Sequence, residues 1–515
     1  MKHKKLPIGI QTFREIREDD CYYVDKTRFA LQLIEQGKAY FLSRPRRFGK
    51  SLFLDTLKEL FEGNEILFEG LYAQTRWNWA VRYPVIRIDF ASGVLRNREE
   101  LDRRILTILR ENRERLDLNC TEPDNPASCF AELLQRAHQK YGQRAVVLVD
   151  EYDKPILDNI TERETAREMR DGLRNLYSVI KGSDAHVKFV FITGVSKFSK
   201  VSLFSGLNNL NDITIDTDYS AICGYTDKDI DTIFAPELEG LDREEIRTWY
   251  NGYNWTGEAV YNPFDLLLLL QKRQFRPWWF ETGTATFLVD LLKERQQFLP
   301  DLENMSALES LVSRFDVDDI PTEALLFQTG YLTIGDVEWT GSKQLYRLRY
   351  PNHEVRMGLT EQMLFALTSN TSATTANLFA LHRLLKANDL NGLKALIQAF
   401  FASIPHDWYR NNPIAQYEGY YASVFYSYFA ALGLKVIPED VTNHGRIDLT
   451  VKFNGHTYLF EFKVAELVPE GRAMEQLKAK DYAAKYRASG QPIHLIGVEF
   501  SKETRNVVGF EVEDV

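Results

Sequence analysis

The stretch Tyr40-Phe-Leu-Ser-Arg-Pro-Arg-Arg-Phe-Gly-Lys-Ser51 decides the fold of the N-terminal part of this chain. It starts as a short apolar strand, Tyr40 to Leu42, and continues into a helix with apolar residues at helical spacing, namely Leu54, Leu57 and Phe61. The turn between them ends in Gly49-Lys50-Ser51, which is the second half of a phosphate-binding loop, G-x-x-x-x-G-K-[ST]. The order strand, loop, helix is the context that such a loop requires.

Each of these three residue types suits the binding of a nucleotide. A helix N-terminus directs free backbone N–H groups at an anion, and Gly49 allows the backbone to approach phosphates closely. Lys50 can reach the β and γ oxygens as a point charge, and the Ser51 hydroxyl can ligate Mg²⁺. The sequence therefore predicts that this loop binds ATP with Mg²⁺.

One position departs from the pattern. Arg44 stands where the first glycine of the loop is expected, and Pro45 favours an extended backbone at Arg44. The alternative for the half-motif alone is a basic turn that caps an ordinary helix. The next constellation favours the phosphate loop.

A second run, Ala145-Val-Val-Leu-Val149, is apolar without alternation, which is typical of a strand buried on both faces of a parallel sheet. Asp150 and Glu151 follow at its carboxyl end, where ligands of α/β sheets lie. Asp150 is suited to hold Mg²⁺ through water, and Glu151 to activate the attacking water. The alternative is a strand that ends in a solvated acidic turn. The two half-motifs stand about 100 residues apart in the proper order, which favours an ATPase.

Another buried strand, Val187 to Ile192, ends in a polar segment that contains Ser196. Ser196 can sense the γ-phosphate, and a plain turn around Gly194 is an equal alternative. Residues 1–216 are thus predicted to form an α/β P-loop domain with alternating strands and helices. Aromatic turns between helices predict a helical or winged-helix-like lid over residues 217–345, and residues 346–405 form a predicted helical connector.

Composition limits the class of protein. The chain has 515 residues and is too long for one core, and 44% of its residues are hydrophobic. Its net charge of -10 excludes a globally basic nucleic-acid binder. The four cysteines form no C-x-x-C pair, so we expect reduced thiols. No signal peptide and no apolar stretch long enough for a membrane span is found, so we expect a cytoplasmic protein without membrane contact.

The last 110 residues contain a second constellation, in residues 406–515. The pair Asn454-Gly455 predicts a two-residue hairpin turn in which Phe453 faces His456. Counting outward places Asp448 opposite Glu461, about 5 Å apart at Cβ. Like charges at that distance repel, and we expect only a metal ion or a proton to relieve the repulsion. The alternative is a solvent-facing strand whose charges are compensated by Arg446 and Lys463.

Lys463 shares the face of Glu461, where it can polarise or deprotonate an attacking water. Oxygen ligands for a divalent cation with a lysine beside them are what metal-assisted hydrolysis of a phosphodiester requires. Glu418 lies at the border of an aromatic helical stripe, where its carboxylate can look into the same site.

These motifs together resemble a bacterial and archaeal family, the AAA-ATPase-like proteins with a C-terminal PD-(D/E)XK-superfamily nuclease domain. The resemblance covers nearly the whole chain, through the segments Tyr23-Val-Asp-Lys-Thr27, Arg44 to Ser51, Asp150 to Pro155, Thr193 to Ser199, Glu418, Gly445 to Asp448, Glu461 to Lys463, and Gln476. Ile447 stands where the family pattern has proline, which removes no ligand. The resemblance implies a restriction-endonuclease-like α/β fold for residues 406–515 and roles in mobile-element or phage conflict.

The resulting prediction is an ATP-binding and ATP-hydrolysing switch coupled to a Mg²⁺-dependent nuclease, with Mn²⁺ as an alternative metal and DNA as the favoured substrate. Arg46 or Arg47 contacts phosphate in cis, or the γ-phosphate of a neighbour in a homo-oligomer. Glu418, Asp448 and Glu461 hold the catalytic metal, Lys463 assists water and Gln476 orients the site. The rival hypothesis is a nucleotide-gated regulatory protein whose nuclease fold binds nucleic acid or a partner without cleaving it.

Overall fold

The computed structural model describes residues 3–197, 207, 209–281, 286–295, 297, 299–303, 305–309, 316–368, 371–402, 418–504 and 506–515. The chain divides into two compact units. The first comprises residues 1–279 and 305–352, and the second comprises residues 280–304 and 353–515. The division into four segments predicted from the sequence stays a prediction.

The first unit is built on a five-stranded parallel sheet of order β2-β3-β4-β1-β5. Its strands are β1 (Ala39–Ser43), β2 (Val85–Asp89), β3 (Ala145–Asp150), β4 (Val187–Gly194) and β5 (Asn211–Asp212). Every residue of β1 and β3 is buried, as their unbroken apolar runs predict for strands covered on both faces. The predicted parallel α/β sheet is therefore confirmed.

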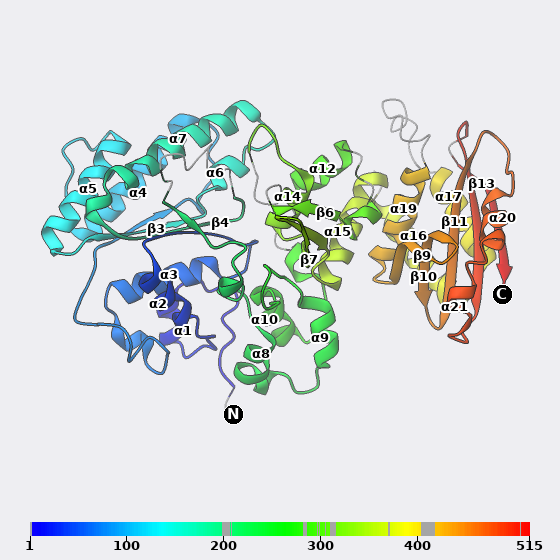
Figure 1. Ribbon diagram of the computed structural model, residues 1–515, viewed down its shortest axis with the longest axis horizontal. Helices are drawn as coiled ribbons and strands as arrows, with labels where there is room; N and C mark the ends of the chain where they lie inside the picture. The colour runs from blue at the N-terminus through cyan, green and yellow to red at the C-terminus, as the bar shows by residue number, and fades with distance from the viewer. Residues whose placement is uncertain are drawn as a thin grey trace. The chain divides into compact units, whose positions relative to one another are not determined.

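Helices cover the two faces of this sheet (Figure 1). One side carries α1 (Phe13–Glu18), α2 (Thr27–Gln36) and α3 (Lys50–Phe61). The other carries α4 (Arg98–Leu116), α5 (Pro126–Tyr141), α6 (Lys154–Leu157) and α7 (Arg163–Gly182). Asn97 and Asn125 cap α4 and α5 by accepting backbone N–H groups, which fixes where these crossover helices begin.

The rest of the first unit is a set of short helices and a small antiparallel sheet. The helices are α8 (Asp227–Ile233), α9 (Arg243–Tyr250), α10 (Pro263–Lys272), α11 (Trp278–Glu281, whose first two residues fall in this unit) and α14 (Thr322–Thr329). The sheet has the order β6-β8-β7, with β6 (Met305–Leu308), β7 (Thr333–Thr340) and β8 (Lys343–Arg349). Thr226 and Asp229 form a reciprocal capping box at the start of α8.

The second unit contains a mixed five-stranded sheet of order β13-β12-β11-β10-β9, in which only β11 and β12 run parallel. Its strands are β9 (Lys435–Thr442), β10 (Gly445–Phe453), β11 (His456–Ala465), β12 (Ile493–Ser501) and β13 (Val507–Asp514). Its helices are α12 (Thr286–Glu294), α15 (His353–Thr368), α16 (Thr371–Lys386), α17 (Leu390–Ala402), α19 (Glu418–Ala431), α20 (Arg472–Ala479) and α21 (Ala484–Arg487). The strand β13 has no counterpart in the prediction.

Aromatic packing fixes α19 on one face of this mixed sheet. Phe425 lies 4.9 Å from Phe462 and Phe429 lies 5.3 Å from Phe460, measured between ring centroids. The opposite face packs against α20 and α21 through a core that includes Leu459. Because strand side chains alternate, Glu461 and Lys463, whose positions alternate with those of Phe460 and Phe462, share the face of α20.

The prediction that all four cysteines are reduced thiols is wrong. Cys120 and Cys129 form a disulfide with a Cα–Cα distance of 5.4 Å, whereas the spacing of the cysteines indicated four thiols. The loop between α4 and α5 folds back on itself and brings two residues together that the sequence separates by nine positions. Cys21 and Cys223 are buried thiols, as expected.

Candidate nucleotide and nuclease sites

The phosphate-binding loop connects β1 to α3 at the carboxyl edge of the parallel sheet. Gly49 precedes the first turn of α3 with φ of 88°, a left-handed conformation that favours glycine. Lys50 is 4% exposed; its ammonium donates to the carbonyl oxygen of Pro45 at 3.0 Å and lies 4.0 Å from the Glu151 carboxylate. The hydroxyl of Ser51 lies close enough to the Asp150 carboxylate to lower its pKa. The structure thus brings Lys50, Ser51, Asp150 and Glu151 together, as the two half-motifs predict.

Arg44 has a structural role in place of the missing glycine. Its guanidinium is fully buried and donates to the carbonyl oxygens of Ser43, Thr214 and Tyr219 at 2.8 to 3.0 Å. It also lies 3.9 Å from the centroid of the Trp255 ring, a cation–π contact. Burial lowers the pKa of Arg44 to about 10. The side chain therefore joins the loop entrance to residues 214–219 and points away from solvent.

Arg46 and Arg47, the predicted phosphate contacts, are exposed on the loop. Arg47 has φ of 69° and its guanidinium lies 4.8 Å from the ring centroid of Phe264 at the start of α10. Both arginines are accessible to a ligand, and their contact with phosphate stays a prediction.

The two acidic residues after β3 occupy different environments. Asp150 is 1% exposed, and burial, helped by the charges of Glu151 and Asp89, raises its pKa to about 6, while the nearby Ser51 hydroxyl opposes the shift. Glu151 is half-buried and has φ of 49°, which is an uncommon backbone conformation for a glutamate. A carboxylate held this way near Lys50 suits the removal of a proton from a water that attacks the γ-phosphate.

Asp153 has a structural role that the sequence did not indicate. It is fully buried and accepts the backbone N–H groups of Val195 and Ser196 and the hydroxyl of Ser196, the last at 2.5 Å. Burial raises its pKa to about 6. Because these donors occupy its carboxylate, Asp153 positions the end of β4, and the predicted γ-phosphate sensor Ser196 donates its hydroxyl inside the protein.

The end of β4 also contacts α14. The N–H of Lys197 donates to Gln328 Oε1 at 2.8 Å. At the end of the same helix, a Cβ added to Gly330 would lie 2.6 Å from the ring of Pro45 in the phosphate loop. Gly330 has φ of 90°, so both conformation and space require glycine there. α14 therefore packs against two loops of the nucleotide site.

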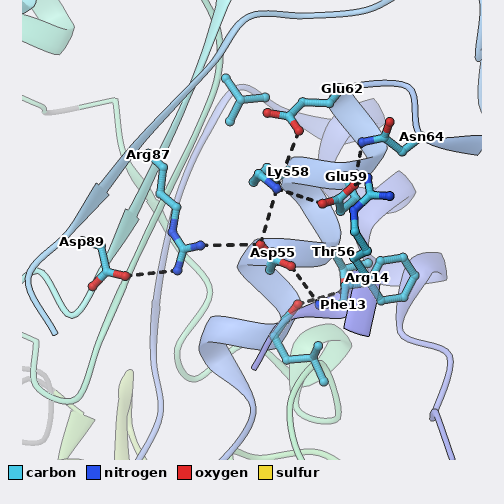
Figure 2. A network of polar contacts seen from close by, with 12 residues as sticks. Phe13, Arg14, Asp55, Thr56, Lys58, Glu59, Glu62, Asn64, Arg87 and Asp89 are labelled. Atoms are coloured by element: carbon cyan, nitrogen blue, oxygen red, sulfur yellow. Dashed lines mark hydrogen bonds and ion pairs between the residues drawn. The ribbon is translucent and has the colours of Figure 1, made fainter. Parts of the chain in front are cut away.

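A partly buried polar network behind α3 fixes the helix that carries Lys50 and Ser51. Figure 2 shows Asp55 between the guanidinium of Arg87 and the backbone N–H of Phe13. Arg87 also donates to Asp89 at 3.1 Å, and Asp89 pairs with Asp150 at the carboxyl ends of β2 and β3. One turn further along, Glu59 accepts Arg14 at 2.9 Å. Asp89 thus lies beside the nucleotide site. That it lies next to Asp150 follows from the strand order of the sheet, which the sequence alone does not give.

The C-terminal hairpin has the predicted register. Five pairs run from Phe453 opposite His456 to Leu449 opposite Phe460, so the next positions are Asp448 and Glu461. Glu461 is fully buried, and the Lys463 ammonium donates to its Oε1 at 3.0 Å. The Asp448 carboxylate accepts the backbone N–H of Phe462 at 2.7 Å. The predicted common face of Glu461 and Lys463 is therefore confirmed.

The expectation that only a metal or a proton relieves the repulsion between Asp448 and Glu461 is wrong. The N–H of Phe462 and the ammonium of Lys463 each donate to one of the two carboxylates. Charge-assisted hydrogen bonds of this kind offset the repulsion inside the protein.

Tyr482, which follows α20, joins the predicted residues into one site. Its side chain is 2% exposed, and Gln476 lies close enough to its hydroxyl to affect its pKa. Burial and the charges of Glu461 and Asp448 raise the pKa of Tyr482, while Gln476 and Lys463 oppose the shift. A Cβ added to Gly445 would lie 2.8 Å from this hydroxyl, so glycine at 445 makes room for it. The alternating pattern of β10 and β11 gave no signal for Tyr482.

Glu499 is a second residue that the sequence did not indicate. It pairs with Lys463 across the parallel strands β11 and β12. Its carboxylate accepts the N–H groups of Gly471 at 3.1 Å and Ala473 at 3.3 Å, which anchors the segment that enters α20. Glu499 thereby sets the position of Gln476 on that helix.

The donor atoms at both sites suit a divalent cation that prefers oxygen ligands. At the first site these are the Ser51 hydroxyl and the Asp150 carboxylate, and at the second the carboxylates of Asp448 and Glu461. Among the described residues no group of three His, Cys, Asp or Glu side chains is arranged to hold a metal ion. The predicted third ligand, Glu418, is the first residue of α19, and its side chain lies outside the described part of the structure.

Comparison with known proteins agrees with this division of sites. Residues 7–204 match a family model described as "Predicted AAA-ATPase", and residues 416–510 match the PD-(D/E)XK nuclease superfamily. An uncharacterized protein in the vnfD 5′ region of Azotobacter chroococcum mcd 1 is 66% identical over 516 residues, with 100% of both chains covered. No solved structure matches the chain. Across the described ranges, no helix combines the length and hydrophobicity that crossing a membrane requires. The chain therefore belongs to the family of AAA-ATPase-like proteins with a C-terminal PD-(D/E)XK-superfamily nuclease domain.

Proposed function

We propose that this protein is a nucleotide-controlled, Mg²⁺-dependent nuclease that cuts DNA. The observation that carries the proposal is the arrangement of Asp448, Glu461 and Lys463 on the paired strands β10 and β11, with an ammonium 3.0 Å from a buried carboxylate. The two matched families support ATPase and nuclease chemistry in one chain. The finer parts of the proposal are DNA as substrate, Mg²⁺ or Mn²⁺ as metal, and a role in mobile-element or phage defence.

The residues of the C-terminal site have separate tasks in this proposal. Asp448, Glu461 and Glu418 would hold the metal ion, which when bound lowers the pKa of a water and neutralises charge on the phosphate. Lys463 directs that water by hydrogen bonding; its ammonium form can donate a proton, and its neutral amine form can accept one. Gln476, which lies near Tyr482, orients the water or the phosphate. The backbone N–H of Phe462 keeps the Asp448 carboxylate oriented toward the site.

The N-terminal site would act as the switch. Lys50 and the N–H groups at the start of α3 bind the phosphates, and Ser51 and Asp150 hold Mg²⁺. Glu151 removes the proton from the attacking water. The end of β4 and the loop at Pro45 both pack against α14, so a change at either loop can be transmitted to that helix. Exposed Arg46 suits a contact with the γ-phosphate of a neighbouring subunit in a homo-oligomer.

The test is a cleavage assay with the full chain on plasmid, linear duplex, single-stranded DNA and RNA, with Mg²⁺ or Mn²⁺, with and without ATP. We expect metal-dependent cleavage of DNA that Glu461→Gln abolishes, because the variant keeps the shape of the side chain but removes a charged ligand. Binding of DNA without cleavage under every condition would support the rival, a regulatory protein that only binds nucleic acid. Cleavage of RNA alone would correct the substrate and leave the nuclease assignment in place.

A further inference from the structure

We infer that the rim loop, residues 466–471 between β11 and α20, inserts an apolar wedge between base pairs of a nucleic-acid duplex bound at the C-terminal site. The inference rests on the proposed nuclease function and adds how that site holds a duplex. The tip of the rim loop presents Leu467 and Val468, which are 48% and 63% exposed. Elsewhere in the described part of the chain, large exposed hydrophobic residues do not occur as neighbours in the sequence.

The rim loop borders the C-terminal site. Leu467 follows Lys463 by four residues, so their Cα atoms are at most about 14 Å apart. Glu499 pairs with Lys463 across β11 and β12, and its carboxylate accepts the N–H groups of Glu470 and Gly471 at the far end of the loop. Successive phosphates of one strand advance about 3.4 Å along a duplex. A duplex with a phosphate beside Lys463 therefore meets the rim loop within about four base steps.

Contacts at both ends hold the rim loop in place. At its start, the carbonyl oxygen of Glu466 accepts the Ser501 hydroxyl at 3.0 Å. Toward its end, Pro469 packs over Gly509 of β13, where an added Cβ would lie 3.1 Å from the Cβ of Pro469. A loop fixed in this way loses little conformational freedom on binding, so its apolar tip can separate stacked bases without first being ordered.

The charges around the tip of the rim loop are compatible with a polyanion. The Glu466 carboxylate accepts the Lys502 ammonium at 2.7 Å, and the Glu470 carboxylate pairs with Arg472. Exposed ion pairs of this kind are weak, so both cations can turn toward phosphate oxygens when a duplex approaches. Contacts with phosphates position a protein on a duplex. The apolar tip thus lies between two cations that can fix the backbone on either side of it.

An aliphatic tip beside phosphate contacts suits insertion between bases. Proteins that kink a duplex insert side chains such as leucine into a base step, which partly unstacks the bases. The alternative occupant is a second protein chain. A stable protein interface takes roughly 800 Å² from each partner, far more than two aliphatic side chains offer. The small size of the apolar tip and its place beside Lys463 therefore favour a duplex.

The test measures duplex binding by the full chain with Glu461→Gln, which keeps the duplex uncut. The probe is a duplex of about 30 base pairs that contains 2-aminopurine, whose fluorescence rises when bases unstack. Adding Leu467→Ser and Val468→Ser should weaken binding about tenfold and remove the rise in fluorescence. Methionine at both positions should restore binding and fluorescence, because it is also an apolar wedge. The matched control is Val515→Ser, at a 50% exposed valine whose N–H bonds Ile493 at the opposite end of β12, and it should change neither.

Each outcome separates the inference from the function on which it rests. Unchanged binding and fluorescence with both serines, or no rise in fluorescence with the native loop, would overturn the wedge while the nuclease assignment stands. Serines that change the oligomeric state and leave duplex binding unchanged would assign the loop to self-association instead. A wild-type protein that neither binds nor cuts a duplex would overturn the proposed function as well. Photo-crosslinking supplies a second measurement: p-benzoylphenylalanine at position 468 should crosslink the duplex and at position 515 should not, and equal crosslinking at both would contradict the inference.

Discussion

The carboxylate of Asp448 accepts the backbone N–H of Phe462 at 2.7 Å, at the position where the paired register of β10 and β11 ends. The neighbouring Glu461 carboxylate is held by Lys463 at 3.0 Å. Two carboxylates on adjacent strands are thereby each fixed by a different donor. A site of this kind is organised before metal binds, and its carboxylate oxygens keep further lone pairs for a cation.

This relationship predicts the behaviour of Asp448→Asn. The amide oxygen can still accept the Phe462 N–H, so we expect the free energy of unfolding without metal to stay within about 1 kcal/mol of wild type. The lost charge should abolish the rise in melting temperature that Mg²⁺ gives the wild type. Thermal melting with and without Mg²⁺, in the absence of nucleotide, measures this. An equal Mg²⁺ effect in wild type and variant would remove Asp448 from the proposed metal site.

Arg44 stands where the loop pattern has glycine, and we expect its replacement by alanine to lower the stability of the protein strongly. Arg44→Ala would leave the carbonyl oxygens of Ser43, Thr214 and Tyr219 without their buried donor, and we expect a loss of about 3 kcal/mol in the free energy of unfolding. The exposed neighbour supplies the control, since Arg46→Ala should change stability by less than about 0.5 kcal/mol. Denaturant unfolding of both variants measures the difference. A similar small change in both would show that the Arg44 contacts contribute little.

Glu151 is the proposed general base of ATP hydrolysis. Glu151→Gln should bind ATP with about the wild-type affinity and hydrolyse it about 100-fold more slowly, because the shape is kept and the base is lost. Exposed Glu164→Gln on α7 is the control and should hydrolyse ATP normally. Binding is measured by calorimetry and turnover by phosphate release. Wild-type turnover in Glu151→Gln would assign the base to another group, and the buried hydrogen bonds of Asp153 make that residue a poor candidate.

The pKa of His353, at the start of α15, allows a prediction of how the free energy of unfolding depends on pH. Burial, with a contribution from the charge of Arg356, lowers its pKa from 6.5 to about 4. The folded state therefore binds fewer protons than the unfolded state between these values, so stability is full above pH 6.5 and is lost as pH falls toward 4. We expect this group to remove about 2 kcal/mol at pH 5. His353→Gln should flatten that loss in denaturant unfolding, and exposed His382→Gln should not; equal slopes would contradict the assignment.

Much of the fold was predictable because apolar runs and turn residues act locally. The runs at β1, β3 and β4 are buried strands, and Asn454-Gly455 fixes the register of the C-terminal hairpin. Contacts between distant parts of the chain were not predictable. The Arg44 guanidinium is bound by carbonyl oxygens of Thr214 and Tyr219, about 170 positions away. The Asp153 carboxylate is bound by backbone N–H groups of Val195 and Ser196.

The C-terminal site shows the same limit. Asp448, Glu461 and Lys463 follow from strand alternation and one turn, because all three lie within one hairpin. Tyr482 lies beyond α20 and reaches the site only because Gly445 leaves space for its hydroxyl. The pairing of Lys463 with Glu499 requires the parallel order of β11 and β12, which no local pattern encodes.

The central claim is that the C-terminal site cleaves nucleic acid, and one comparison of two lysines on the same hairpin tests it most directly. Lys463 bonds the buried Glu461, whereas Lys452 lies over the ring of Tyr486 at 4.4 Å from its centroid. In a plasmid-cleavage assay with Mg²⁺ and ATP, we expect Lys463→Ala to lower the rate about 100-fold or more and Lys452→Ala to change it less than about threefold. Wild-type cleavage by Lys463→Ala, or no cleavage by the wild-type protein with any divalent metal, would contradict the claim.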